Sequence, residues 1–266
     1  MPDVDRFELD LEIAETTVSG TVVDKDSGDP VSDASVGLRR SSARTGPDGR
    51  FSIAVEPGEY RLEAQAPGRR RTVLPLDVGP NGLSDVRVEM ERGVDLRGRV
   101  VDAAGRPAPN LEVDAADPAG DLTGNAYTLA DGSFRIDGLA AQPCTLVTGG
   151  DLPGWAVRGG VTPGDEPVTL ALRPGGRIAV RALDADGRPV KDAYPEVQKV
   201  GGLAVVMPGG SDSTDASGFV EIGAPTGLLE VAVGSRAQAG RGSVTVRAGE
   251  TSPLTVVLLP QAPKKP

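Results

Sequence analysis

The chain has 266 residues, with 36 glycines, 23 prolines, an aromatic content of 3% and a net charge of −10. Histidine is absent, which excludes a histidine general base, a histidine-containing zinc site and a Ser-His-Asp triad. The acidic balance argues against nucleic acid as a partner, because phosphates need a basic surface. No run of about 18 apolar residues occurs, so the sequence predicts no membrane-spanning helix.

The first predicted element is a strand, because apolar residues alternate with polar ones at Phe7, Leu9, Leu11 and Ile13. An alternating strand cannot bury its apolar face alone. We therefore expect residues 1–14 to be the closing strand of a preceding module or an N-terminal extension. The first ten residues lack the apolar stretch of a signal peptide, which leaves a cytoplasmic protein or a mature or excised segment as the alternatives. Because the strand resembles the closing strand of a preceding sandwich, we expect a piece of a longer multi-domain chain.

Two landmarks recur at intervals of about eighty residues, which is the sign of internal repeats. The first is an opening strand that ends in an aspartate, at Asp24, Asp102 and Asp184, and is followed by a turn with glycine and proline. The second is a glycine-containing turn followed by a phenylalanine and alternating apolar residues. Because both landmarks share one period, the sequence predicts three tandem units.

Each unit has the period-two pattern of half-buried strands, as at Val18–Val22, Phe51–Val55 and Tyr60–Ala64 in the first unit. Turn signals at intervals of roughly 8–12 residues predict six or seven short strands, which is typical of a β-sandwich. The predicted fold class is therefore all-β. The predicted boundaries are 15–92, 93–173 and 174–260, the third unit being the most divergent, with a disordered tail at 261–266.

The phenylalanine of the second landmark is predicted to be the central core residue of each sandwich. These residues are Phe51, Phe134 and Phe219.

The landmarks resemble the pattern of carboxypeptidase regulatory-like domains. The first unit carries this resemblance most closely, with Gly20, Asp24 and Pro30 in its opening part and Asp48-Gly49-Arg50-Phe51 in its turn. The second unit resembles the family well and the third in part. The resemblance implies three tandem immunoglobulin-like, or prealbumin-like, seven-stranded sandwiches.

The resemblance implies an accessory, non-catalytic module of secreted, periplasmic or cell-surface proteins. In the namesake enzymes, such a module lies beside a zinc peptidase domain, whose histidine ligands have no counterpart here. We therefore expect a structural spacer or a protein-interaction module of a bacterium, outside the cytoplasm, with other proteins or surface glycans as partners. Two alternatives remain: a carbohydrate-binding module, since the fold is similar to starch-binding domains, and an accessory domain of a secreted peptidase or transporter.

Calcium is a weak candidate ligand of the segment DKDSGD, where Asp24, Asp26 and Asp29 lie close together. Aspartate and glycine are also common turn residues, and the other two units replace the cluster. Asp212 and Asp215 are equally weak candidates. No cofactor and no catalytic residue is predicted.

Trp155 is the only tryptophan and a weak candidate for stacking on a sugar; packing against the sandwich is the favoured interpretation. Cys144 is the only cysteine, so it forms no disulfide within the chain, and it is predicted to be a buried strand residue. The basic run Arg69–Arg71 is interpreted as a solvated strand edge, with anion binding as the alternative.

Overall fold

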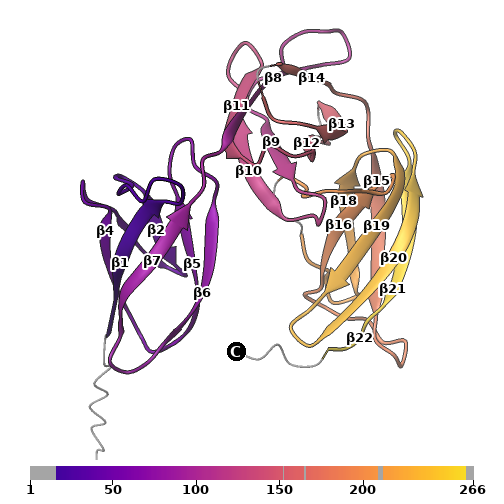
Figure 1. Ribbon diagram of the computed structural model, residues 1–266. Helices are drawn as coiled ribbons and strands as arrows, with labels where there is room; N and C mark the ends of the chain where they lie inside the picture. The colour runs from indigo at the N-terminus through magenta and orange to yellow at the C-terminus, as the bar shows by residue number, and fades with distance from the viewer. Residues whose placement is uncertain (1–15, 152, 165, 209–211, 262–266) are drawn as a thin grey trace, which may run out of the picture. The chain divides into compact units, whose positions relative to one another are not determined.

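The computed structural model describes residues 16–151, 153–164, 166–208 and 212–261, and its regular elements are β-strands (Figure 1). The all-β fold class is therefore confirmed. The described chain divides into two compact units, of which the first contains the first repeat up to Arg92. The second contains Gly93 onward together with Gly68–Arg70. The expectations for residues 1–14 and for most of the tail at 261–266 fall outside the described residues.

The first unit is a sandwich of seven strands. They are β1 (Thr16–Asp24), β2 (Ser35–Leu38), β3 (Ser41–Arg44), β4 (Arg50–Val55), β5 (Gly58–Gln65), β6 (Thr72–Val78) and β7 (Leu83–Met90). One sheet has the order β4-β1-β7 and the other β3-β2-β5-β6. The opening strand β1 is antiparallel to β4 and parallel to the closing strand β7, so it is the central strand of its sheet.

The second repeat has the same topology. Its strands are β8 (Val94–Val101), β9 (Glu112–Ala116), β10 (Leu122–Tyr127), β11 (Ser133–Leu139), β12 (Cys144–Gly150), β13 (Gly154–Val161) and β14 (Val168–Ala171). The sheet orders are β11-β8-β14 and β10-β9-β12-β13. The opening strand β8 is again flanked by an antiparallel and a parallel neighbour.

The third repeat has eight strands where seven were predicted. They are β15 (Gly176–Leu183), β16 (Tyr194–Val200), β17 (Leu203–Ala204), β18 (Phe219–Ala224), β19 (Gly227–Gly234), β20 (Gln238–Val246), β21 (Thr251–Val257) and β22 (Leu259–Pro260). The sheet orders are β18-β15-β21 and β17-β16-β19-β20-β22. The additional strand β22 follows the closing strand directly and pairs with the edge of the opposite sheet at β20.

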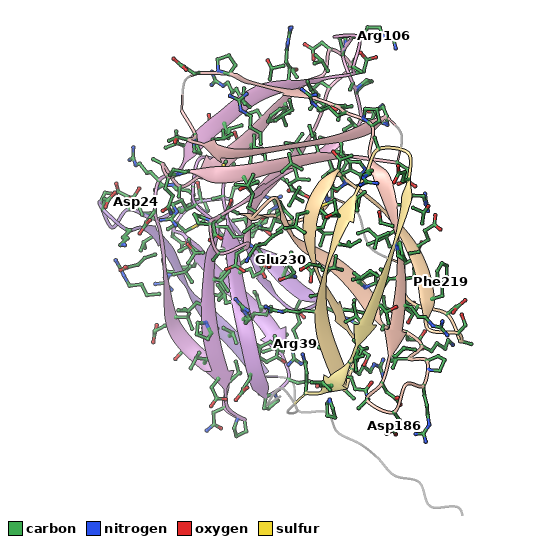
Figure 2. All side chains as sticks on the ribbon, turned by 90° about the vertical axis from the view of Figure 1, so that its right-hand side faces the viewer. Asp24, Arg39, Arg106, Asp186, Phe219 and Glu230 are labelled. Atoms are coloured by element: carbon green, nitrogen blue, oxygen red, sulfur yellow. The ribbon has the colours of Figure 1, made fainter. Side chains whose placement is uncertain are left out.

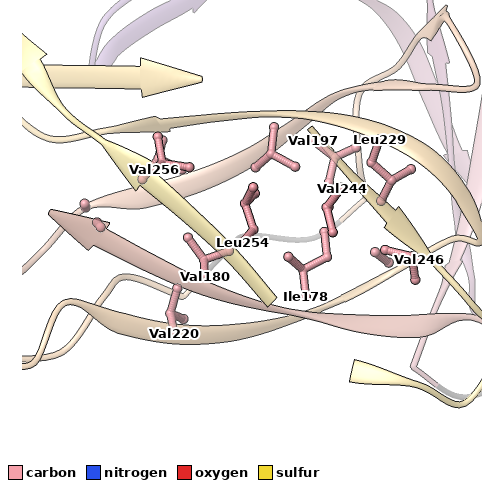
Figure 3. Close-up of a cluster of buried hydrophobic side chains, with 14 of the residues drawn as sticks. Ile178, Val180, Val197, Val220, Leu229, Val244, Val246, Leu254 and Val256 are labelled. Atoms are coloured by element: carbon pink, nitrogen blue, oxygen red, sulfur yellow. The ribbon is translucent and has the colours of Figure 1, made fainter. Parts of the chain in front are cut away.

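Three clusters of buried apolar side chains lie between these sheets, one in each repeat. Figure 3 shows the cluster of the third repeat, to which Ile178 and Val180 of β15 and Leu229 of β19 contribute. Fully burying one such side chain contributes roughly 1.5–3 kcal/mol, so the apolar core is the main stabilising feature of each sandwich. The predicted boundaries of the three units remain a prediction, because the second and third repeats lie in one compact unit.

A buried threonine is repeated at the same place in every sandwich. Its hydroxyl accepts a hydrogen bond of 2.8 to 3.0 Å from one backbone N–H and donates one of 2.7 to 2.8 Å to a backbone carbonyl. Both partners lie in the connection that crosses from the opening strand to the opposite sheet. The groups of N–H donor, threonine and carbonyl acceptor are Ala34, Thr45 and Val31; Leu111, Thr128 and Ala108; and Ala193, Thr214 and Val190.

The core prediction is correct for Phe51 and Phe134, which are 5% and 4% exposed, but wrong for Phe219, which is 42% exposed. Figure 2 shows Phe219 on the surface of the third sandwich. Gly49, Gly132 and Gly218 share a φ of 73–74°, and the core residue follows each of these turn glycines by two positions. In the third repeat that residue is Val220, and a shift of one residue moves a side chain to the other face of a strand.

The opening strand is matched to this core residue. Gly20 pairs with Phe51 and Gly98 with Phe134, and a Cβ at Gly98 would overlap the ring of Phe134. In the third repeat, Val180 pairs with Val220. A small and a large residue have therefore been replaced by two of intermediate size, which keeps the core filled.

Replacing Phe134 by alanine should cost about 3–5 kcal/mol of the free energy of unfolding, because it leaves a core cavity. Val220→Ala should cost about 2 kcal/mol for the same reason. Phe219→Ala should change the value by no more than about 0.5 kcal/mol, since its ring is at the surface. Residue-resolved hydrogen exchange measures the three changes in the free energy of unfolding. Equal losses for Phe219→Ala and Val220→Ala would contradict the strand register that buries Val220 and exposes Phe219.

Thr45→Val should destabilise the first unit by about 1–3 kcal/mol, because an isosteric change leaves a buried N–H and a buried carbonyl without their partner. Thr45→Ser should lose less, since it keeps the hydroxyl. Thr17→Val, at an exposed position of β1, is the matched control and should be close to neutral. Hydrogen exchange of the first-unit amides gives the change in the free energy of unfolding for each of the three variants. A change for Thr45→Val equal to that of the Thr17→Val control would show that the hydroxyl does not stabilise the fold.

Candidate functional site

A cavity of about 460 Å³ lies in the second unit, between the second and third sandwiches. Its wall combines aromatic and apolar groups with acidic ones. The wall includes Asp151 and Trp155 of the second sandwich and Arg177, Tyr194, Met207 and Glu221 of the third. The hairpin of β12 and β13 brings the first two residues to this place, since Asp151 lies in its turn and Trp155 in β13.

Trp155 is buried, with an exposure of 8%, so the structure places it as a packing residue. Its ring edge, at Cδ1 and Nε1, lies against Gly175, where a Cβ would overlap the ring. Its backbone N–H donates to the carbonyl of Arg173 at 2.8 Å, which attaches β13 to the segment leading into the third sandwich. Its indole N–H is buried without a hydrogen-bond partner among the described residues. The tryptophan side chain therefore packs into the joint between the two sandwiches.

Arg177 links the two sandwiches electrostatically. Its guanidinium donates to the carboxylate of Glu221 on the neighbouring strand and to that of Asp151 across the joint. The hydrogen bond that Arg177 donates to Glu221, and next the charge of Asp151, raise the pKa of Arg177, so the cation is firmly held. A Cβ at Gly223 would overlap the carboxylate of Asp151, so a larger residue there would displace that side chain from its present position.

The aspartates of the calcium hypothesis have a structural role. Asp24 is 2% exposed, and its Oδ1 accepts hydrogen bonds from the backbone N–H groups of Asp26 and Ser27 at 2.9 and 3.0 Å. Its other oxygen faces Arg92 at 3.4 Å. Within the described ranges, no three acidic or cysteine side chains come together as a metal site.

The corresponding aspartates of the other repeats hold their turns in the same way. Asp102 accepts from the N–H groups of Ala104 and Arg106, and Asp184 from those of Asp186 and Arg188. Asp215 accepts from Ser217 and Phe219, and the hydrogen bond from the Ser217 hydroxyl is the main cause that lowers its pKa. These carboxylates therefore act as turn caps.

Cys144 is buried, as predicted, and its Sγ lies 3.2 Å from the carbonyl oxygen of Val161. Burial raises the pKa of its thiol to about 11, which keeps it protonated and unreactive at neutral pH. In the basic run, Arg71 forms an ion pair with Glu63 at 2.6 Å, which agrees with a strand-edge role.

Sequence reasoning missed Asp114, a carboxyl group that is 4% exposed on β9. Burial, and then the charge of Glu112, raise its pKa to about 7. It lies in the segment Glu112–Ala116, where alternation predicts that Val113 and Ala115 are buried and that Asp114 is solvated. Asp114 is covered by a second layer that packs on the outer face of its sheet. The local sequence around Asp114 does not indicate that such a layer is present.

Comparison with solved structures finds a TIE protein and pilin subunits of bacteria. The TIE protein of Bacillus anthracis is 14% identical and has a TM-score of 0.29 over 92% of this chain, which spans about half of that protein (51%). A streptococcal ancillary pilin is 10% identical over 93% of this chain and 100% of its own, with a TM-score of 0.29. The major pilin subunit BcpA of Bacillus cereus is 11% identical over the same shares, with a TM-score of 0.25. At these values the likeness carries no argument about function.

No curated protein matches the chain. The described part of the chain contains no helix that is long and apolar enough to cross a membrane. The family model of the carboxypeptidase regulatory-like domain matches residues 17–91 and 95–170, which together make up more than half of the chain. The two matched ranges contain the turn aspartates, turn glycines and core phenylalanines of the first two repeats, and the third repeat lies outside them. The chain therefore belongs to the carboxypeptidase regulatory-like domain family.

Proposed function

We propose that the chain is a non-catalytic spacer and interaction array of a bacterium, acting outside the cytoplasm, in which the second and third sandwiches form one rigid body. Membership of a family of accessory sandwich domains supports the non-catalytic and extracytoplasmic parts. The non-catalytic part is supported further by the sequence, which has no histidine and whose single cysteine is a buried thiol.

The observation that carries the proposal is the interlocked joint between the two sandwiches. Trp155 and Asp151 fit against Gly175 and Gly223, and Arg177 connects the two sides by charge. Val147 of the second sandwich is completely buried in the apolar cluster of the third. A joint that combines apolar packing with a held ion network resists bending, which is what a spacer that presents a binding surface at a fixed distance requires.

Single-molecule FRET tests the rigid joint. The variants Ala103→Cys and Ala185→Cys, at equivalent exposed turn positions of the two repeats, carry the dyes in a Cys144→Ala background. A narrow FRET distribution is expected for this protein. Gly175→Val should broaden it, because the new side chain would displace the ring of Trp155. Gly234→Val is the matched control, since a side chain there points into open space. A broad distribution before any joint substitution would sink the proposal.

Glycan binding is a second candidate function, favoured by the aromatic and acidic wall of the cavity. Trp155 itself offers little ring surface, but Tyr194 on the same wall is 56% exposed and able to stack on a sugar. The carboxylates of Asp151 and Glu221 are hydrogen-bond acceptors for hydroxyl groups, although Arg177 already engages both.

Because Trp155 is the only tryptophan, its fluorescence reports on this cavity specifically. If glycans bind here, titration with oligosaccharides should shift the emission, and Tyr194→Ala should abolish the shift. Tyr127→Ala, which removes a similarly exposed tyrosine from β10, should leave the shift unchanged. Unaltered emission at millimolar oligosaccharide, or an equal loss in both variants, rejects glycan binding at this site.

A further inference from the structure

Two central strands of the second sandwich are buried on both faces. In β9, Val113 and Ala115 face the core of their own sandwich, yet Asp114 and Ala116, on the other face, are only 4% and 1% exposed. Residues of opposite faces alternate along a strand, so a second layer must cover this sheet from outside. Val147 of β12, which pairs with Asp114 across the sheet, lies in the apolar cluster of the third sandwich. The third sandwich therefore covers Asp114.

Asp114 carries a carboxyl group into this covered face, and no cation among the described residues forms an ion pair with it. The charged group that acts on it is Glu112, two residues earlier on the same face, which has the same sign. The cross-strand neighbours, Asn125 of β10 and Val147 of β12, are uncharged. Asn125 donates to the carboxylate of Glu112 at 2.7 Å, which holds the side chain of Glu112 in place.

The third sandwich contributes charged groups to the same joint, around a cavity of about 270 Å³ that also touches Gly120 of the hairpin between β9 and β10. None of them acts on the pKa of Asp114. Lys199 is held by Glu230 at 3.0 Å. The charged residues that line this cavity are Glu196, Lys199, Glu230 and Arg241.

We infer that the joint between the second and third sandwiches is pH-responsive, and that its closed form requires Asp114 to be uncharged. An ionised carboxylate between two packed layers, with Glu112 beside it, has little contact with solvent and no counter-ion among the described residues, so it opposes the closed joint. In an opened joint the same carboxylate is hydrated. This inference rests on the rigid joint of the proposed function and specifies the condition under which that joint loosens.

The direction follows from linkage. The closed form holds the proton of Asp114 up to about pH 7, because burial and Glu112 raise its pKa, whereas an exposed aspartate releases it near pH 4. Closure is therefore strongest below about pH 4 and weakens as the pH rises to about 7, beyond which it changes no further. Within this window the ratio of open to closed joint should rise by up to about tenfold per pH unit.

The FRET pair described above tests this at pH values from about 5 to 8. The open population should grow with pH in the parent protein and stay constant in Asp114→Asn, which keeps the shape but does not titrate. Glu112→Gln removes one of the two causes that raise the pKa of Asp114, so the open population should stop growing at a lower pH and reach a smaller final value than in the parent protein. A joint that stays narrow at every pH overturns the inference and leaves the rigid joint standing. A joint that is broad at every pH overturns the proposed function as well.

Direct titration covers the case in which Asp114→Asn does not fold. The ¹³Cγ resonance of Asp114 in the unmodified chain should titrate near pH 7, and in Gly175→Val, whose joint is opened, it should titrate closer to pH 4. Titration near pH 4 in both proteins, or near pH 7 in both, would show that the closed joint is not what holds the proton, and the inference would then be wrong.

Discussion

The fold depends on the buried threonine hydroxyl that fastens two crossing connections in every sandwich. The chain passes from one sheet to the other between the first two strands of a repeat and returns between the third and fourth. At these crossings the backbone leaves the ladder, and its buried polar groups need another partner. Thr45, Thr128 and Thr214 supply that partner as donor and acceptor at once. The two sheets are thereby held face to face at one fixed point, around which each core is built.

The repeated architecture was predictable because its determinants are local. The turn aspartates, the turn glycines and the alternating apolar residues act within a few positions of themselves, and these produced the all-β class and the family resemblance. The register of the third repeat was not predictable from its phenylalanine alone. Phe219 follows its turn glycine by one residue and Val220 by two, and only pairing with Val180 determines which of them is buried.

The candidate site was predictable only in part, because it is built by contact between repeats. Trp155 stood out as the only tryptophan, and packing was the favoured interpretation, in agreement with its burial. Its partner Gly175 and the pair of Asp151 with Gly223 carry no recognisable motif. Asp114 was missed for the same reason. The alternating pattern of its strand predicts that the carboxylate is exposed to solvent, but a neighbouring sandwich covers it. Long-range packing, absent from any local pattern, decides both residues.

The exchange of Gly98 and Phe134 for Val180 and Val220 has a consequence for how neighbouring repeats sort their strands. Tandem copies of one sandwich risk pairing a strand of one copy with the sheet of the next while the chain folds. If the opening strand of the third repeat entered the second sandwich, the branched side chain of Val180 would meet the ring of Phe134, where a glycine leaves room. The reverse exchange would place Gly98 opposite Val220 and leave a void. Exchanging the opening strands of the two adjoining sandwiches would therefore give a steric clash in one core and a void in the other. The two sandwiches can pack closely against each other while each strand pairs within its own sheet.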